Sequence, residues 1–105
     1  MLDDIRRAGC RRIVVIGDII NGVDPVGCVD LLAGHPAAVC LSGNAEWYLA
    51  TPDLHAFPLE QFRWLDEVIA LVEWWRARLD AAQRDWLAGL PHMLVEQDCC
   101  FVHDS

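Results

Sequence analysis

Residues 13–25 read IVVIGDIINGVDP. The run begins with four β-branched residues, a pattern that is typical of a short strand buried on both faces. Gly17 and Asp18 then end the apolar run and begin a polar loop. Pro25 follows at a position where the first turn of a helix tolerates proline. The stretch therefore predicts a strand, a loop and a helix over residues 26–32, which is the opening unit of an α/β fold.

The alternation of helix and strand continues on both sides of this unit. Residues 37–46, AAVCLSGNAE, predict a second strand that ends in a Ser-Gly-Asn turn. The expected helices cover residues 2–8, 26–32, 46–50, 59–79 and 81–90, and the expected strands cover residues 12–16, 37–41, 93–95 and 99–102, with an irregular linker over 51–58. This order predicts one layered α/β domain with a mainly parallel first part.

The composition limits the classes of function. The chain has 105 residues with 8 Lys and Arg against 16 Asp and Glu, a formal charge of −8. Binding to a nucleic-acid duplex or an anionic membrane is not expected, because both need clustered basic residues. The sequence predicts no membrane span and no signal peptide, and it favours a cytoplasmic location. A hydrophobic fraction of 54% excludes intrinsic disorder.

The cysteine content points to the same compartment. There are five cysteines, an odd number, and no C-x-x-C pair, which argues against a disulfide framework and a zinc site. Cys40, Cys99 and Cys100 lie in apolar strand-like runs, where a thiol behaves as a small hydrophobic group. We therefore expect buried structural thiols.

Three polar side chains come directly after expected strands. They are Asp18, Asn44 and His103, which supply a carboxylate, an amide oxygen and an imidazole. In open α/β sheets, ligands collect beyond the carboxyl ends of the strands. A mixed set of oxygen and nitrogen ligands suits Mn, Fe, Zn or Co better than calcium. The three side chains are therefore candidate metal ligands at the end of the sheet.

Three motifs in this order resemble those of a known enzyme family. They are Gly17-Asp18 with Gly22 and Asp24-Pro25, then Gly43-Asn44-x-Glu46, then Val102-His103-x-Ser105. The pattern is similar to that of the calcineurin-like metallophosphoesterases, in particular the small bacterial phosphodiesterase and phosphatase branch. The resemblance covers nearly the whole chain. It implies part of a layered α/β/β/α sandwich with a mainly parallel sheet.

The resemblance also implies a chemistry. Family members hydrolyse phosphate mono- or diesters by a metal-bound hydroxide, with two divalent ions drawn from Mn, Fe, Zn, Co or Ni. Asp18 would match the carboxylate that bridges the two ions, and Asn44 and His103 would match ligands of the second ion. Asn21 stands where relatives hold the phosphate. The implied substrate is a phosphate-ester small molecule or a nucleotide.

The chain also departs from the family pattern. The family's first motif, D-x-H, and its last, G-H-x-H, have no counterpart, so the expectation is an incomplete domain that is inactive as given. Ala45 occupies the position of the histidine that assists the leaving group, and no residue is assigned a catalytic role. Glu46 is expected to be ionised near neutral pH unless it is strongly buried.

Other interpretations stay open. The chain could be a non-catalytic metal- or phosphate-binding relative, as Ala45 suggests, or a structural α/β interaction fragment in which Asp18 and Asn44 only form turns. The other histidines are assigned to loops without a role: His35, His55 and His92. The tryptophans indicate core packing or an interface, including a homo-oligomer through the Trp-rich helix: Trp47, Trp64, Trp74, Trp75 and Trp86.

Overall fold

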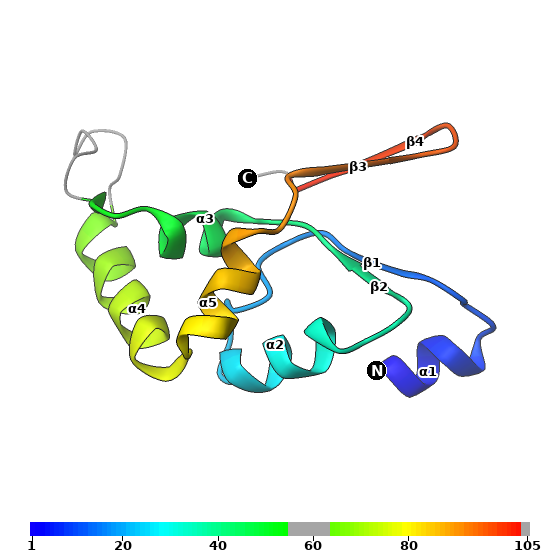
Figure 1. Ribbon diagram of the computed structural model, residues 1–105, viewed down its shortest axis with the longest axis horizontal. Helices are drawn as coiled ribbons and strands as arrows, with labels where there is room; N and C mark the ends of the chain where they lie inside the picture. Colours follow the sequence, from blue (N-terminus) through cyan, green and yellow to red (C-terminus); the bar gives the residue numbers. More distant parts are fainter. Residues whose placement is uncertain (55–63, 104–105) are drawn as a thin grey trace.

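The computed structural model describes residues 1–54 and 64–103, and within them helices and strands alternate. The helices are α1 (Leu2–Arg7), α2 (Pro25–Ala33), α3 (Asn44–Ala50), α4 (Leu65–Arg78) and α5 (Ala81–Ala88), and the strands are β1 (Ile13–Val15), β2 (Ala38–Cys40), β3 (Met93–Glu96) and β4 (Cys99–Val102). The expected mixture of helices and strands is therefore confirmed (Figure 1).

Strands β1 and β2 form a parallel pair that α2 connects. Ile13 lies opposite Ala38, and the register continues to the ends of both strands. Helix α2 begins where the sequence predicts, because the Asp24 carboxylate accepts a hydrogen bond of 2.9 Å from the Gly27 amide and Pro25 fills the first helical position. The two carboxyl ends of the strands therefore meet at one edge, with the loops that follow them side by side.

The last two strands form a separate hairpin. Strand β3 pairs with β4 in antiparallel fashion, and the turn passes through Gln97, whose φ is 51°. Each pair is its own two-stranded sheet within the described residues, so the expected single, mainly parallel sheet is not seen there. Figure 1 shows the hairpin projecting away from the helices. Its alternate side chains consequently face solvent rather than a second layer.

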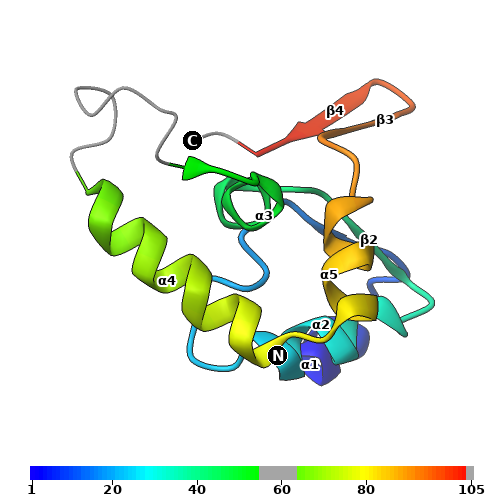
Figure 2. The ribbon, with the colours of Figure 1, turned by 60° about the vertical axis from the view of Figure 1, so that its left-hand side comes forward.

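The hydrophobic core lies among the helices rather than under the hairpin. Helix α3 packs against both α4 and α5, and α2 closes the group (Figure 2). The largest side chains in this core are almost fully buried: Trp75, Ile20, Leu41, Leu87, Val29 and Val72. The core thus fixes α3, whose first turn carries the candidate site, against the rest of the chain.

Two predicted features differ from the structure. Cys40 is buried as expected, but the remaining cysteines are exposed: Cys10, Cys28, Cys99 and Cys100. Burial of Cys99 and Cys100 is predicted from their apolar neighbours, whereas within residues 1–54 and 64–103 no second layer covers the hairpin. Helix α3 also begins at Asn44 instead of residue 46.

The Trp-rich helix has both buried and exposed members. In α4, Trp75 is buried, while Trp64, which precedes the helix, is exposed. The prediction for residues 59–63 and for His55 lies outside the described residues. In the part of the chain that the structure describes, no helix combines the length and the apolar character that crossing a lipid bilayer requires.

Candidate functional site

The loop after β1 makes a sharp reversal at its first two residues. Gly17 has a φ of 102° and Asp18 a φ of 55°, so both adopt left-handed conformations. Aspartate adopts a positive φ more readily than most residues. The conformation is still uncommon, and it persists where the surrounding structure stabilises it. The reversal directs the Asp18 carboxylate toward the start of α3, where its Oδ1 accepts a hydrogen bond of 3.1 Å from the Ala45 amide.

The loops after β1 and β2 approach so closely that glycine is required in both. A Cβ atom added at Gly43 would lie 2.5 Å from the Asp18 amide nitrogen. One added at Gly17 would lie 2.7 Å from the Gly43 Cα and 2.9 Å from the Nδ1 of His103. The two glycines therefore allow three segments, from positions far apart in the sequence, to meet at one place.

Glu46 joins the two loops from the inside. Its side chain is 1% exposed, and its Oε1 accepts hydrogen bonds from the amides of Asp18 at 2.7 Å and Gly43 at 2.9 Å. Its Oε2 accepts a longer one, 3.4 Å, from the Ile20 amide. Desolvation raises the pKa of Glu46 above its ordinary value, and the negative charge of Asp18 adds to this, while the three amides oppose it.

The sequence predicts an ionised Glu46 unless it is strongly buried, and the structure shows that it is strongly buried. Sequence reasoning did not assign it this positioning role. A glutamate at the third position of a helix that follows a glycine turn is the available signal, because an acid there often accepts a hydrogen bond from the preceding backbone. Its bond to Gly43 fits that pattern, whereas its bonds to Asp18 and Ile20 span 28 and 26 positions.

His103 reaches the site from the end of β4. Its Nδ1 lies 2.7 Å from the carbonyl oxygen of Ile16, and since a carbonyl only accepts, Nδ1 carries the proton. In the neutral ring the lone pair is then on Nε2, which lies 3.6 Å from the Oδ2 of Asp18. A lone pair and a carboxylate oxygen repel each other unless a cation or a proton lies between them.

A divalent metal ion would fit this arrangement. Ligand atoms that lie about 2.0–2.2 Å from one zinc ion are roughly 3 to 3.7 Å apart in the usual geometries, and the Asp18–His103 separation of 3.6 Å falls in that range. A ligating histidine typically donates its other ring N–H to a carbonyl or carboxylate, as His103 does to Ile16. The donor set therefore has the chemistry that a transition metal prefers.

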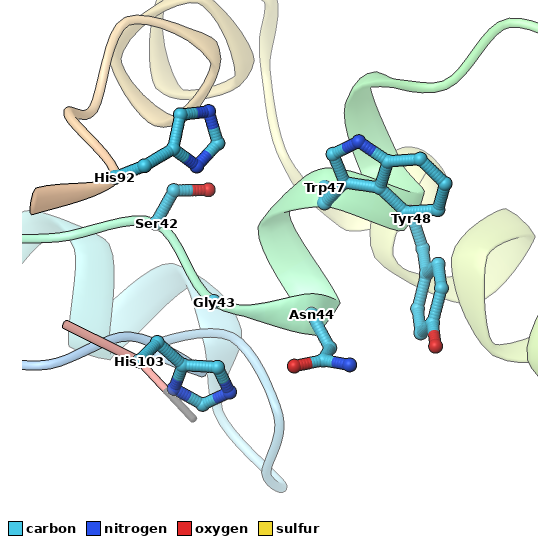
Figure 3. A pocket seen from close by; sticks show the side chains of 7 residues that line it. All are labelled: Ser42, Gly43, Asn44, Trp47, Tyr48, His92 and His103. Carbon is cyan, nitrogen blue, oxygen red and sulfur yellow. The ribbon is translucent and has the colours of Figure 1, made fainter. Parts of the chain in front are cut away.

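Asn44 completes the group that the sequence predicts. It is the first residue of α3 and lines a pocket of about 350 Å³ together with His103, as Figure 3 shows. It also lines a smaller adjacent pocket with Asp18. The structure thus brings Asp18, Asn44 and His103 to one region at the carboxyl end of β1 and β2, although they come from three separate segments.

Two further predicted positions, Asn21 and Ala45, lie close to Asp18. Asn21 is exposed on the loop after β1 and lines the smaller pocket with Asp18 and Asn44. Ala45 is 3% exposed and offers only its backbone amide. Among residues 1–54 and 64–103, no three His, Cys, Asp or Glu side chains form a metal-binding group. The predicted set contains only two residues of these types, because its third member is an amide.

Sequence reasoning missed the wall of the larger pocket. Trp47 and Tyr48 line it from α3, and His92, which was assigned no role, lines it from the segment before β3 (Figure 3). The helical spacing was the available signal, because residues three and four positions after Asn44 share its face of a helix. No sequence pattern indicates that His92 lies close to Asn44 and Trp47, because its position depends on where β3 begins relative to α3.

The chain matches no known family model, no curated protein and no solved structure in the three comparisons made.

Proposed function

We propose that this chain holds a divalent transition-metal ion through Asp18, Asn44 and His103 and thereby contributes one metal site to the hydrolysis of phosphate esters. The observation that carries the proposal is the orientation of His103. Its Nδ1–H is engaged by a backbone carbonyl, and its Nε2 faces a carboxylate oxygen at 3.6 Å. Motif order along the chain, which resembles that of calcineurin-like metallophosphoesterases, supports the same assignment.

The residues of the site have distinct tasks in this proposal. A bound divalent ion would supply charge neutralisation for the phosphate oxygens and would acidify a water molecule. Asp18 and His103 hold the ion, Asn44 offers a neutral oxygen, and Ile16 fixes the tautomer of His103. Glu46 keeps the two loops at the correct separation through its hydrogen bonds to Asp18 and Gly43. Asn21 lines the smaller pocket with Asp18, and in this proposal it contacts the phosphate.

The wider context of the proposal follows from the composition and the thiols. We propose that the parallel pair β1–β2 belongs to a layered α/β/β/α sandwich. A formal charge of −8 favours a small phosphate ester over a polynucleotide. Four exposed, unpaired thiols favour a reducing compartment such as the cytoplasm.

A second candidate is a metal- and phosphate-binding protein that does not catalyse hydrolysis. The specific observation in its favour is Ala45, which places a methyl group where a proton donor would assist the leaving group. Both candidates need the same metal ligands. They differ only in turnover.

Metal binding is the appropriate first test, because it does not depend on ligands beyond these three. We expect isothermal titration with Mn²⁺ or Co²⁺ to detect one site that Asp18→Ala and His103→Ala abolish. Asp98→Ala is the matched control, since Asp98 is an exposed carboxylate in the turn between β3 and β4. Binding that persists in both site variants, or no binding by the unmodified chain, would reject the assignment.

A further inference from the structure

The largest feature of the site that metal binding does not use is the pocket beside Asn44. Its volume of about 350 Å³ lies in the lower part of the range of small-molecule pockets, about 300–1,000 Å³. Asn44 and His103 form one end of it, and Trp47, Tyr48 and His92 form its sides. The pocket is therefore continuous with the proposed metal site.

Helix α3 divides its side chains between the core and this pocket. Ala45, Glu46 and Leu49 are buried on one side. Trp47 and Tyr48, three and four positions after Asn44, lie on the pocket side, and their rings meet edge to face at 5.5 Å. Trp47 is nevertheless 40% exposed.

The opposite side of the pocket is polar. Ser42 and His92 line it, and Figure 3 shows the His92 ring beside Ser42 and across the pocket from Trp47. An aromatic ring on one side with hydroxyl and imidazole groups on the other suits a planar ring that carries polar atoms at its edge. A ligand that joins such a ring to a phosphate would place its phosphate at the end formed by Asn44 and His103.

We infer that this pocket binds the organic group of the substrate, and that the group is a flat ring that stacks on Trp47. The substrate class is thus an aryl or nucleoside phosphate rather than an alkyl phosphate. The inference rests on the proposed function, since Asn44 and His103 bind the phosphate only with their metal ion in place. It adds specificity that the metal ligands do not provide, because the ion that they hold would contact only the phosphate.

The test compares three ligands on the chain loaded with Mn²⁺: 1-naphthyl phosphate, ethyl phosphate and inorganic phosphate. Isothermal titration should give tighter binding of naphthyl phosphate than of ethyl phosphate. Trp47→Leu keeps apolar area but removes the ring, and it should weaken naphthyl phosphate roughly 2- to 12-fold, as expected for the loss of an aromatic pair. Binding of inorganic phosphate should not change.

Two further variants distinguish the loss of ring stacking from a general loss of folded structure. Trp47→Phe retains a ring and should keep most of the preference for naphthyl phosphate. Trp64→Leu removes an exposed tryptophan that does not line this pocket and should leave all three ligands unaffected. The inference is overturned if Trp47→Leu leaves naphthyl phosphate unchanged or weakens all three ligands equally. If the unmodified chain binds Mn²⁺ but no phosphate, or binds no Mn²⁺, the proposed function fails and the inference fails with it.

Discussion

Replacing Glu46 by alanine would remove the acceptor that three backbone amides share. The amides of Asp18 and Gly43 lie 2.7 and 2.9 Å from Oε1, and the Ile20 amide lies 3.4 Å from Oε2. Each buried amide that loses its acceptor costs about 1–3 kcal/mol, and the amide at the longer distance costs less. Relief of the desolvation that raises the pKa of Glu46 offsets part of this loss.

The free energy of unfolding of Glu46→Ala should therefore fall by about 2–4 kcal/mol at pH 7, a large part of the roughly 5–15 kcal/mol of a small domain. Urea denaturation followed by tryptophan fluorescence measures this change, because Trp75 is buried in the core that α3 packs against. Glu46→Gln keeps one carbonyl acceptor, so its free energy of unfolding should lie between those of the unmodified chain and Glu46→Ala.

The matched control is Glu73→Ala on the exposed face of α4. A surface substitution of this kind should change the free energy of unfolding by no more than about 0.5 kcal/mol. If Glu46→Ala is as stable as the Glu73 control, the hydrogen bonds of Glu46 do not hold the two loops together, and its positioning role is refuted.

Two other predictions concern the same loops. Gly43→Ala should weaken Mn²⁺ binding and destabilise the chain, because its Cβ would lie 2.5 Å from the Asp18 amide nitrogen; an unchanged dissociation constant would contradict the close approach of the two loops. Since the pKa of Glu46 in the folded chain is raised above its ordinary 4.5, its contribution to stability is present below that pH and is lost as the pH rises through the raised pKa. The stability of the metal-free chain, measured relative to that of Glu46→Gln, should thus be greater at pH 4 than at pH 7. An equal difference between the urea midpoints of the two proteins at both pH values would contradict this.

Local sequence patterns predicted the elements near the site well. The β-branched run became β1 (Ile13–Val15), and the Asp24-Pro25 pair begins α2 as proline and capping chemistry require. Helix α3 starts earlier than predicted, because the Asn44 turn continues directly into the helix. In each case the decisive interactions lie within four residues, which is the range that periodicity and turn residues report.

The features that were missed depend on contacts between distant segments. The hydrogen bond from the Asp18 amide to Glu46 spans 28 positions, and no local pattern encodes it. Cys99 and Cys100 are exposed because no other described segment covers their hairpin, whereas their apolar neighbours indicated burial. The meeting of His103 with Asp18 was expected from the family resemblance, whereas the rule for strand ends in one sheet does not cover it, because β4 pairs with β3 and not with β1 or β2 in the described residues.

A crystal structure of the chain grown with Zn²⁺, with anomalous diffraction recorded above and below the zinc absorption edge, would locate the metal ion. We expect an anomalous peak between Asp18 and His103, at about 2.0–2.2 Å from the Nε2 of His103 and from a carboxylate oxygen of Asp18, with Asn44 beside it. A peak elsewhere on the chain, or none at this position with zinc in excess, would contradict it.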